Sequence, residues 1–141
     1  MKNVEYSQRP ERIEVVELPR KHVLDFLREN ITETVEDGET RYTADEYRLT
    51  LVRRGGMEAE IAAQFAEYLA RAKTAEYEEL ASEIRAKRAK LLSETDYLFT
   101  EDYPMYDEEK EPWRVYRQAL RDIPEQPGFP YEVVFPAKPG R

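Results

Sequence analysis

The chain has 141 residues, of which 37% are charged and 40% hydrophobic, and its formal net charge is -8. This length and composition permit one modest core or two small ones, and the negative charge disfavours nucleic acid and anionic lipid as direct partners. The absence of cysteine excludes disulfides, zinc-thiolate sites and cysteine nucleophiles.

The N-terminal residues lack the apolar core of a signal peptide, and no run of about 18 apolar residues could span a bilayer. We therefore expect a soluble protein that is made in the cytoplasm and does not act at a membrane.

Between Glu11 and about Leu51 the pattern predicts a small antiparallel sheet, because β-branched and aromatic residues occur in short, partly alternating runs. These residues include Ile13, Val15, Val16, Val23, Phe26, Leu27, Ile31, Val35, Tyr42, Tyr47, Leu49 and Leu51. The pair Asp37-Gly38 predicts a tight hairpin turn, since both of its positions need a positive φ. Residues 21–30 suit either a strand or a short helix, and we favour the strand.

The next segment predicts a turn followed by a long helix. Arg53-Arg54-Gly55-Gly56 contains an RGG triplet, but one copy in an acidic chain favours a turn over an RNA-binding tract. From Met57 to about Glu94 there is no proline or glycine, which predicts one long helix or two abutting helices.

Two apolar stripes run along this helix at an offset, so that either the stripe rotates around the helix or the helix breaks near residues 73–76. The first stripe is Ile61, Phe65, Tyr68 and Ala72, and the second is Tyr77, Leu80, Ile84 and Leu91. We expect the first half to pack on the sheet and the second half on the C-terminal segment. The alternative is a short coiled coil that joins copies of the chain into a homo-oligomer.

Residues 97–107 interleave aromatic and acidic side chains. Glu101, Asp102 and Asp107 lack the spacing and the glycine of a calcium-binding loop, so we expect no metal. We expect Asp107 to cap a helix whose first turn carries Glu108 and Glu109, and the tyrosines to cover a small core.

A second helix is predicted from about Glu108 or Pro112 to Asp122. Its apolar face carries Trp113, Tyr116, Leu120 and Ile123, and its other side carries Arg114, Arg117 and Arg121. The arginines could bind carboxylates of a partner, but a solvated face with local ion pairs is the favoured interpretation.

From Pro124 onward the chain holds five of its nine prolines and is predicted to run extended, with a brief strand at residues 131–135. Phe129, Val133 and Phe135 are the expected anchors of this tail. They either dock on the helices, which we favour, or contact a partner.

The predicted fold class is therefore α+β: a small N-terminal antiparallel sheet, one long central helix, and a C-terminal helical hairpin that ends in an extended proline-rich tail. The predicted regions are 1–55, β-rich; 56–95, the long helix; and 96–141, the second helix and the tail.

The C-terminal part resembles the phage tail assembly chaperone family. The resemblance rests on KRAKLLSETDY, WRVYRQALRDIP, QPGFP and VVFPAKP between Lys87 and Pro139, and a similar ending occurs in tail-fibre assembly proteins. Two aromatic residues depart from the usual pattern, since Tyr97 and Phe135 stand where many members have tryptophan. The first 80 residues lie outside the resemblance.

The resemblance implies a phage tail or tail-fibre assembly factor that acts in the host bacterial cytoplasm and binds a tail or fibre protein. The alternative is a permanent structural component of the virion tail. The predicted partner-binding residues are Trp113, Tyr116, Leu120, Phe129, Val133 and Phe135.

Catalysis and a cofactor are not expected. The single histidine, His22, has no cysteine or second histidine to pair with, and no serine lies in a nucleophile-elbow context. A lone histidine in a mixed apolar run is typical of a surface or packing residue.

Overall fold

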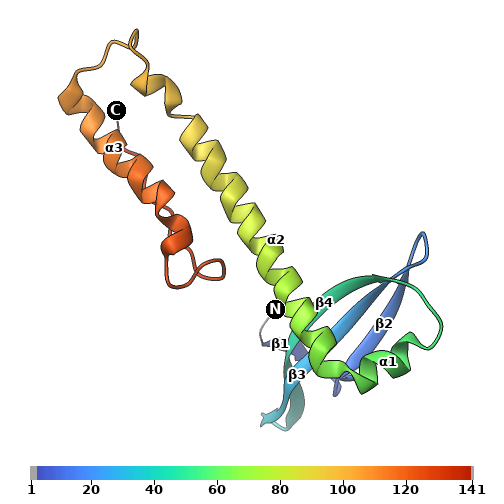
Figure 1. Cartoon of the computed structure of the whole chain (residues 1–141). Coiled ribbons are helices and arrows are strands. Elements are labelled where there is room, and N and C mark those ends of the chain that lie inside the picture. Colours follow the sequence, from blue (N-terminus) through green and yellow to red (C-terminus); the bar gives the residue numbers. More distant parts are fainter. Residues whose placement is uncertain (1–2, 141) are drawn as a thin grey trace. The chain divides into compact units, whose positions relative to one another are not determined.

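A computed structural model describes residues 3–140 (Figure 1). The chain divides into two compact units, with the boundary between Glu76 and Tyr77, and we call them the N-terminal and C-terminal units. Over the described residues the structure has one four-stranded antiparallel sheet and three α-helices, which confirms the α+β class.

The sheet of the N-terminal unit has the strand order β1-β4-β3-β2, and every neighbouring pair is antiparallel. Its strands are β1 Val4–Tyr6, β2 Ile13–Leu18, β3 His22–Glu36 and β4 Glu39–Val52. The strand favoured for residues 21–30 is confirmed, as is the turn between β3 and β4, where Asp37 and Gly38 have φ of 53° and 82°. The short strand β1 was not predicted.

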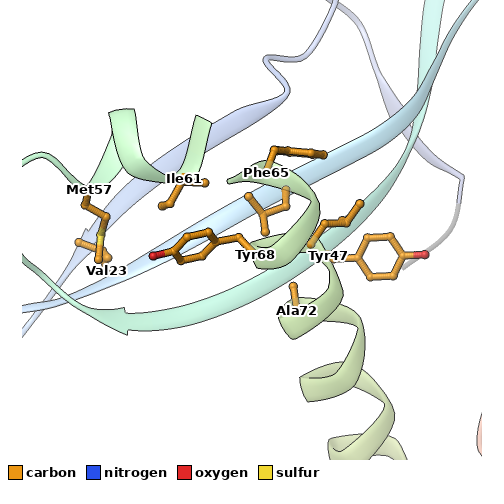
Figure 2. Close-up of a cluster of buried hydrophobic side chains, with 9 residues drawn as sticks. Val23, Tyr47, Met57, Ile61, Phe65, Tyr68 and Ala72 are labelled. Carbon is orange, nitrogen blue, oxygen red and sulfur yellow. The ribbon is translucent and has the colours of Figure 1, made fainter. Parts of the chain in front are cut away.

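Two helices supply the other half of the N-terminal core. They are α1, Met57–Ala63, and the first part of α2, Phe65–Ser93. Figure 2 shows the side chains that they place against β3 and β4. The predicted first stripe is confirmed as the core-facing one, because its members all lie in one buried cluster: Ile61, Phe65, Tyr68 and Ala72, together with Val23, Leu27, Tyr47, Met57 and Leu69.

The long helix breaks at Gln64, where φ is -117° and ψ is 33°. Of the two alternatives for the offset stripes, the break near residues 73–76 is wrong, since α2 continues through them. Neither proline nor glycine marks Gln64, so we attribute the break to packing. It lets Ile61 of α1 and Phe65 of α2 both reach the same core. The apolar stripe of α2 therefore rotates instead.

The C-terminal unit contains the end of α2, two short 3₁₀ turns and one helix. These elements are η1 Asp96–Phe99, α3 Asp107–Arg121 and η2 Ile123–Glu125. The buried cluster is Leu98, Trp113, Tyr116, Leu120 and Ile123, and half-buried residues of α2 that include Ile84 and Leu91 pack against it.

The start of α3 corrects one prediction. Tyr106, and not Asp107, is the residue before the first helical position, and the Glu109 carboxylate accepts a hydrogen bond from its backbone N–H at 2.9 Å. Asp107 instead begins the first turn, where the partial positive charge of the helix N-terminus favours a carboxylate.

The strand predicted at residues 131–135 does not form. Instead, the side-chain amide of Gln126 donates to the carbonyl of Val134 at 2.8 Å and accepts from its N–H at 2.9 Å. Pro130 and Pro136 lack N–H donors and would interrupt a ladder of backbone hydrogen bonds, so one side chain takes the place of a strand partner.

None of the helices in residues 3–140 is long and apolar enough to cross a membrane.

Candidate functional site

The six predicted partner-binding residues come together in the core of the C-terminal unit. Trp113, Tyr116 and Leu120 are buried, and half-buried residues of the tail pack against them, namely Phe129, Val133 and Phe135. A direct contact of these six with a partner stays a prediction. All six belong to or pack against the core of this unit, so they hold the surface of the C-terminal unit in place.

A pocket of about 620 Å³ opens beside this core. Three segments line it, and all of them belong to the C-terminal unit: Tyr97, Leu98, Tyr103 and Met105 before α3, Glu109, Pro112 and Trp113 of α3, and Lys138, Pro139 and Gly140 at the end of the tail. Its walls are mainly aromatic rings, proline rings and methionine. Such a surface suits an apolar or aromatic side chain from outside.

Two tyrosines form the outer wall of the pocket. The rings of Tyr97 and Tyr103 meet edge to face, with centroids 5.1 Å apart and planes at 78°. Tyr97 is 47% exposed, whereas Leu98 after it is buried in the core cluster, so of these two lining residues Tyr97 is the one that faces outward. A phenol ring offers a large apolar face and one hydroxyl, a combination that is common at binding surfaces.

The floor and the far wall are held by separate contacts. Trp113 lies in the core with its ring 6.1 Å from that of Tyr116, edge to face. The tail is tied to the turn after α2 by the ion pair of Lys138 with Glu94 at 3.7 Å, and to α2 itself by the Lys87 ammonium, 4.1 Å from the centre of the Phe135 ring. The pocket wall therefore depends on tail docking.

Arg117 fixes η1 and the end of α2, which corrects its assignment to a solvated face. Its guanidinium donates to the Leu92 carbonyl at 2.8 Å and to the Thr95 hydroxyl at 2.6 Å, and it pairs with Asp96 at 2.8 Å. The last carbonyls of a helix lack a partner within the helix. The Leu92 carbonyl accepts from Thr95, and the Arg117 guanidinium of α3 adds a further donor. Tyr97 follows directly, so Arg117 positions the pocket wall.

Arg114, by contrast, makes the local pairs that the favoured interpretation expected, with Asp107 and with Glu111, each at 3.1 Å. These hydrogen bonds raise the pKa of Arg114 above its usual value, with Glu111 as the larger cause.

Sequence reasoning missed the pocket residues outside the core, above all Tyr97, Tyr103, Met105 and Pro139. The interleaved aromatic residues of 97–107 were a usable signal for the pocket. The prediction that the tyrosines cover a small core is confirmed for Tyr103, which packs against it. The non-helical spacing of these aromatic residues does not say which rings point inward.

Among residues 3–140 no three His, Asp or Glu side chains gather in a way that could hold a metal ion.

A second cluster of functional-group side chains lies in the N-terminal unit, on the sheet face away from the helices. Arg28 is buried there and pairs with Glu46 at 3.0 Å and Glu14 at 2.6 Å, while the Tyr6 hydroxyl donates to Glu46 at 2.6 Å. Burial opposes the charge of Glu46, but the hydrogen bonds from Tyr6 and Arg28 outweigh it and lower the pKa of that carboxyl.

This cluster has a structural task. β1 and β2 lie at opposite edges of the sheet, so the connection between them must cross β4 and β3. Arg28 donates to the Glu11 carbonyl of that connection at 2.9 Å. The buried ions thus hold the crossing segment on the sheet.

Comparison with known families places the pocket in a matched segment. Residues 81–140 match the model of the family described as phage tail assembly chaperone protein, which confirms the resemblance predicted between Lys87 and Pro139. All residues that line the pocket fall within the matched range. Comparison with curated proteins and with solved structures finds no match.

Proposed function

We propose that this chain is a non-catalytic phage tail assembly factor whose C-terminal unit binds a short apolar segment of a tail or tail-fibre protein. The observation that carries the proposal is the exposed aromatic pocket, which lies wholly within the segment that matches the tail assembly chaperone family. Binding there covers apolar surface that would otherwise aggregate before the tail is complete.

The physical basis is a small contact with one anchor. An apolar side chain of the partner enters between Tyr97, Tyr103 and Pro139, and is desolvated on several sides. Lys138 and Glu109 stand at the same pocket and can bind the backbone or polar groups of the segment. The net charge of -8 keeps the complex soluble while assembly proceeds.

The tail residues Phe129, Val133 and Phe135 extend this surface in the proposal, because they are half-buried and keep part of their area open to a partner. Trp113, Tyr116 and Leu120 act from beneath by holding the pocket floor in place. The region 96–141, with the end of the long helix, then forms the binding module, and it acts in the cytoplasm of the host bacterium.

A photo-crosslinking experiment tests the proposal. Tyr97 is replaced by p-benzoylphenylalanine in the full chain, which is produced together with the tail and fibre proteins of its phage, and crosslinked products are identified by mass spectrometry. We expect one tail or fibre protein as the main product. The matched control carries the same group at Val115, which is 62% exposed on α3 and outside this pocket. Equal crosslinking from both positions, or none from Tyr97, would contradict the proposal.

Mass spectrometry of purified particles then separates a transient chaperone from a permanent tail component. Absence of the chain from particles supports the chaperone, and a stoichiometric amount supports the component. Sedimentation velocity tests the alternative in which copies of the chain associate through the long helix. A monomer at all concentrations would contradict that alternative.

A further inference from the structure

The hairpin of β3 and β4 continues past both strands that flank it. β2 pairs with β3 only as far as Leu27, and β1 pairs with β4 only as far as Tyr42. Beyond them the two strands pair only with each other, and residues 32–41, which we call the β-arm, are all exposed (Figure 1). From the pair Thr34 and Arg41 to its tip, the β-arm is a two-stranded ribbon with two open edges.

The base of the β-arm is built and fixed. The pairing register shifts between Glu29 and Thr32, and Asn30 there has a φ of 53°. The Asn30 side-chain amide donates to Asp45 at 2.8 Å, which holds this irregularity in place. A bulge of this kind bends a strand and increases its twist. The ribbon is therefore presented at a set angle by its own sheet.

Folding does not account for the composition of the β-arm. An exposed two-stranded ribbon buries little apolar surface and adds little stability. Glu36 lies directly opposite Glu39 at the tip, and like charges in that position destabilise a strand pair. Glu33 and Asp37 add two more acids, against the single cation of Arg41.

The longer open edge belongs to β3, over residues 30–36. An edge of this kind presents N–H and C=O groups to any strand that lies beside it. Natural edges are often protected by charged side chains, by proline or by bulges. The β-arm has no lysine or proline, and its protection is acidic, with a bulge at its base. Its glutamates repel a second acidic arm but attract an extended segment that carries lysine or arginine.

We infer that the β-arm is a docking element that takes up a basic, extended segment of a partner protein as an added strand on the β3 edge. Main-chain hydrogen bonds provide the pairing, and Glu33 and Glu36 select for basic side chains. The inference does not depend on the pocket of the C-terminal unit. It assigns a partner contact to the part of the chain that the family match does not cover.

The test is a peptide titration of the full ¹⁵N-labelled chain. The probe is Lys-Val-Thr-Lys-Val-Thr-Lys, and its two controls replace lysine with glutamate or carry N-methyl groups on alternate backbone nitrogens. We expect saturable shifts of the backbone amides of residues 32–36, slower exchange of those amides, and no such response to either control peptide.

Two charge-reversed variants complete the test. We expect Glu33→Lys with Glu36→Lys to weaken binding by about tenfold or more, since two of the attracting carboxylates are reversed. Glu78→Lys with Glu79→Lys, two exposed glutamates of α2, should leave it unchanged. No saturable binding, equal binding of the N-methylated peptide, or equal effects of the two variants would overturn the inference.

Discussion

The two units bury different chemistry. Among the described residues, the N-terminal unit encloses the acidic and basic side chains of Asp25, Arg28 and Glu46, each at most 4% exposed. The core of the C-terminal unit is aromatic and aliphatic, and its one fully enclosed polar side chain is that of Thr95, among the described residues. The C-terminal unit is thus held by ring and aliphatic packing, whereas the N-terminal unit combines a hydrophobic core with a buried polar arrangement.

The two buried acids of the N-terminal unit extend the contrast to the two faces of one sheet. Glu46 lies on the face away from the helices and is paired, whereas Asp25 lies in the same row as Val15 and Leu49 on the helix-covered face. Neither carboxyl oxygen of Asp25 has a hydrogen-bond partner in the structure. Burial alone raises the pKa of Asp25, so this group favours the neutral form.

Removal of Arg28 should give the largest loss of stability. Arg28→Ala leaves Glu46 buried without its main cation, which we expect to cost about 3–5 kcal/mol in the free energy of unfolding. Arg48→Ala is the matched control, because Arg48 pairs with the same carboxylate at 3.4 Å but its side chain is 52% exposed. Urea unfolding, followed through amide signals of β3 and β4, measures both. Similar losses in the two variants would show that burial is not what makes Arg28 matter.

In the C-terminal unit the comparable test is the stability lost when a substitution leaves a cavity in the core. Leu120→Ala removes a fully buried side chain from the core of this unit, and we expect a loss of about 2–5 kcal/mol. Val115→Ala on the same helix should change stability by no more than about 0.5 kcal/mol. Trp113 is the single tryptophan, so its fluorescence reports this unit selectively. An unaffected Leu120→Ala variant would contradict the packing described for α3.

Asp25 should act in the opposite sense, because its burial is unfavourable once it is charged. The pKa of Asp25 is raised on folding. Below the pKa that it has in the unfolded chain, Asp25 is neutral in both states and costs no stability. As pH rises from there through the folded pKa, the charged form is favoured only in the unfolded chain, and the free energy of unfolding falls. Asp25→Leu should therefore stabilise the unit at pH 7 by about 1–3 kcal/mol and remove this fall.

Thermal unfolding across pH 4 to 8 measures the effect, with the exposed Asp102→Asn as the control. Glu46 works against Asp25 at low pH, because its pKa is lowered and its contribution is lost as pH falls. A melting temperature that rises steadily from pH 5 to 8 in the wild type, with the same profile in Asp25→Leu, would show that burial of Asp25 does not destabilise the unit.

The elements that sequence predicted well are those with a strong local signal. Asp37-Gly38 strongly predicts a hairpin turn. The apolar spacing of Ile61, Phe65, Tyr68 and Ala72 correctly predicts which residues face the core. The break at Gln64 and the strand β1 had no such signal. Both follow from contacts distant in sequence, namely the shared core of α1 and α2, and the pairing of β1 with β4.

The site was predictable only in part for a similar reason. Periodicity identifies the buried face of α3, and so it found Trp113, Tyr116 and Leu120. The pocket above them is made by an irregular loop and by the end of the tail, where no period applies. The role of Arg117 was equally hidden, because its partners lie 22 to 25 residues away at the end of α2.

Arg117 also provides the finest test of how the C-terminal unit is held. Arg117→Lys keeps the charge but loses the planar set of donors that reaches Leu92, Thr95 and Asp96 together, so we expect a loss of about 1 kcal/mol. Arg121→Lys, on the exposed side of the same helix, should be neutral. Trp113 fluorescence in urea measures both, and crosslinking from position 97 reports the pocket wall. If Arg117→Lys lowers stability but crosslinking is unchanged, then Arg117 stabilises the helix end without positioning Tyr97.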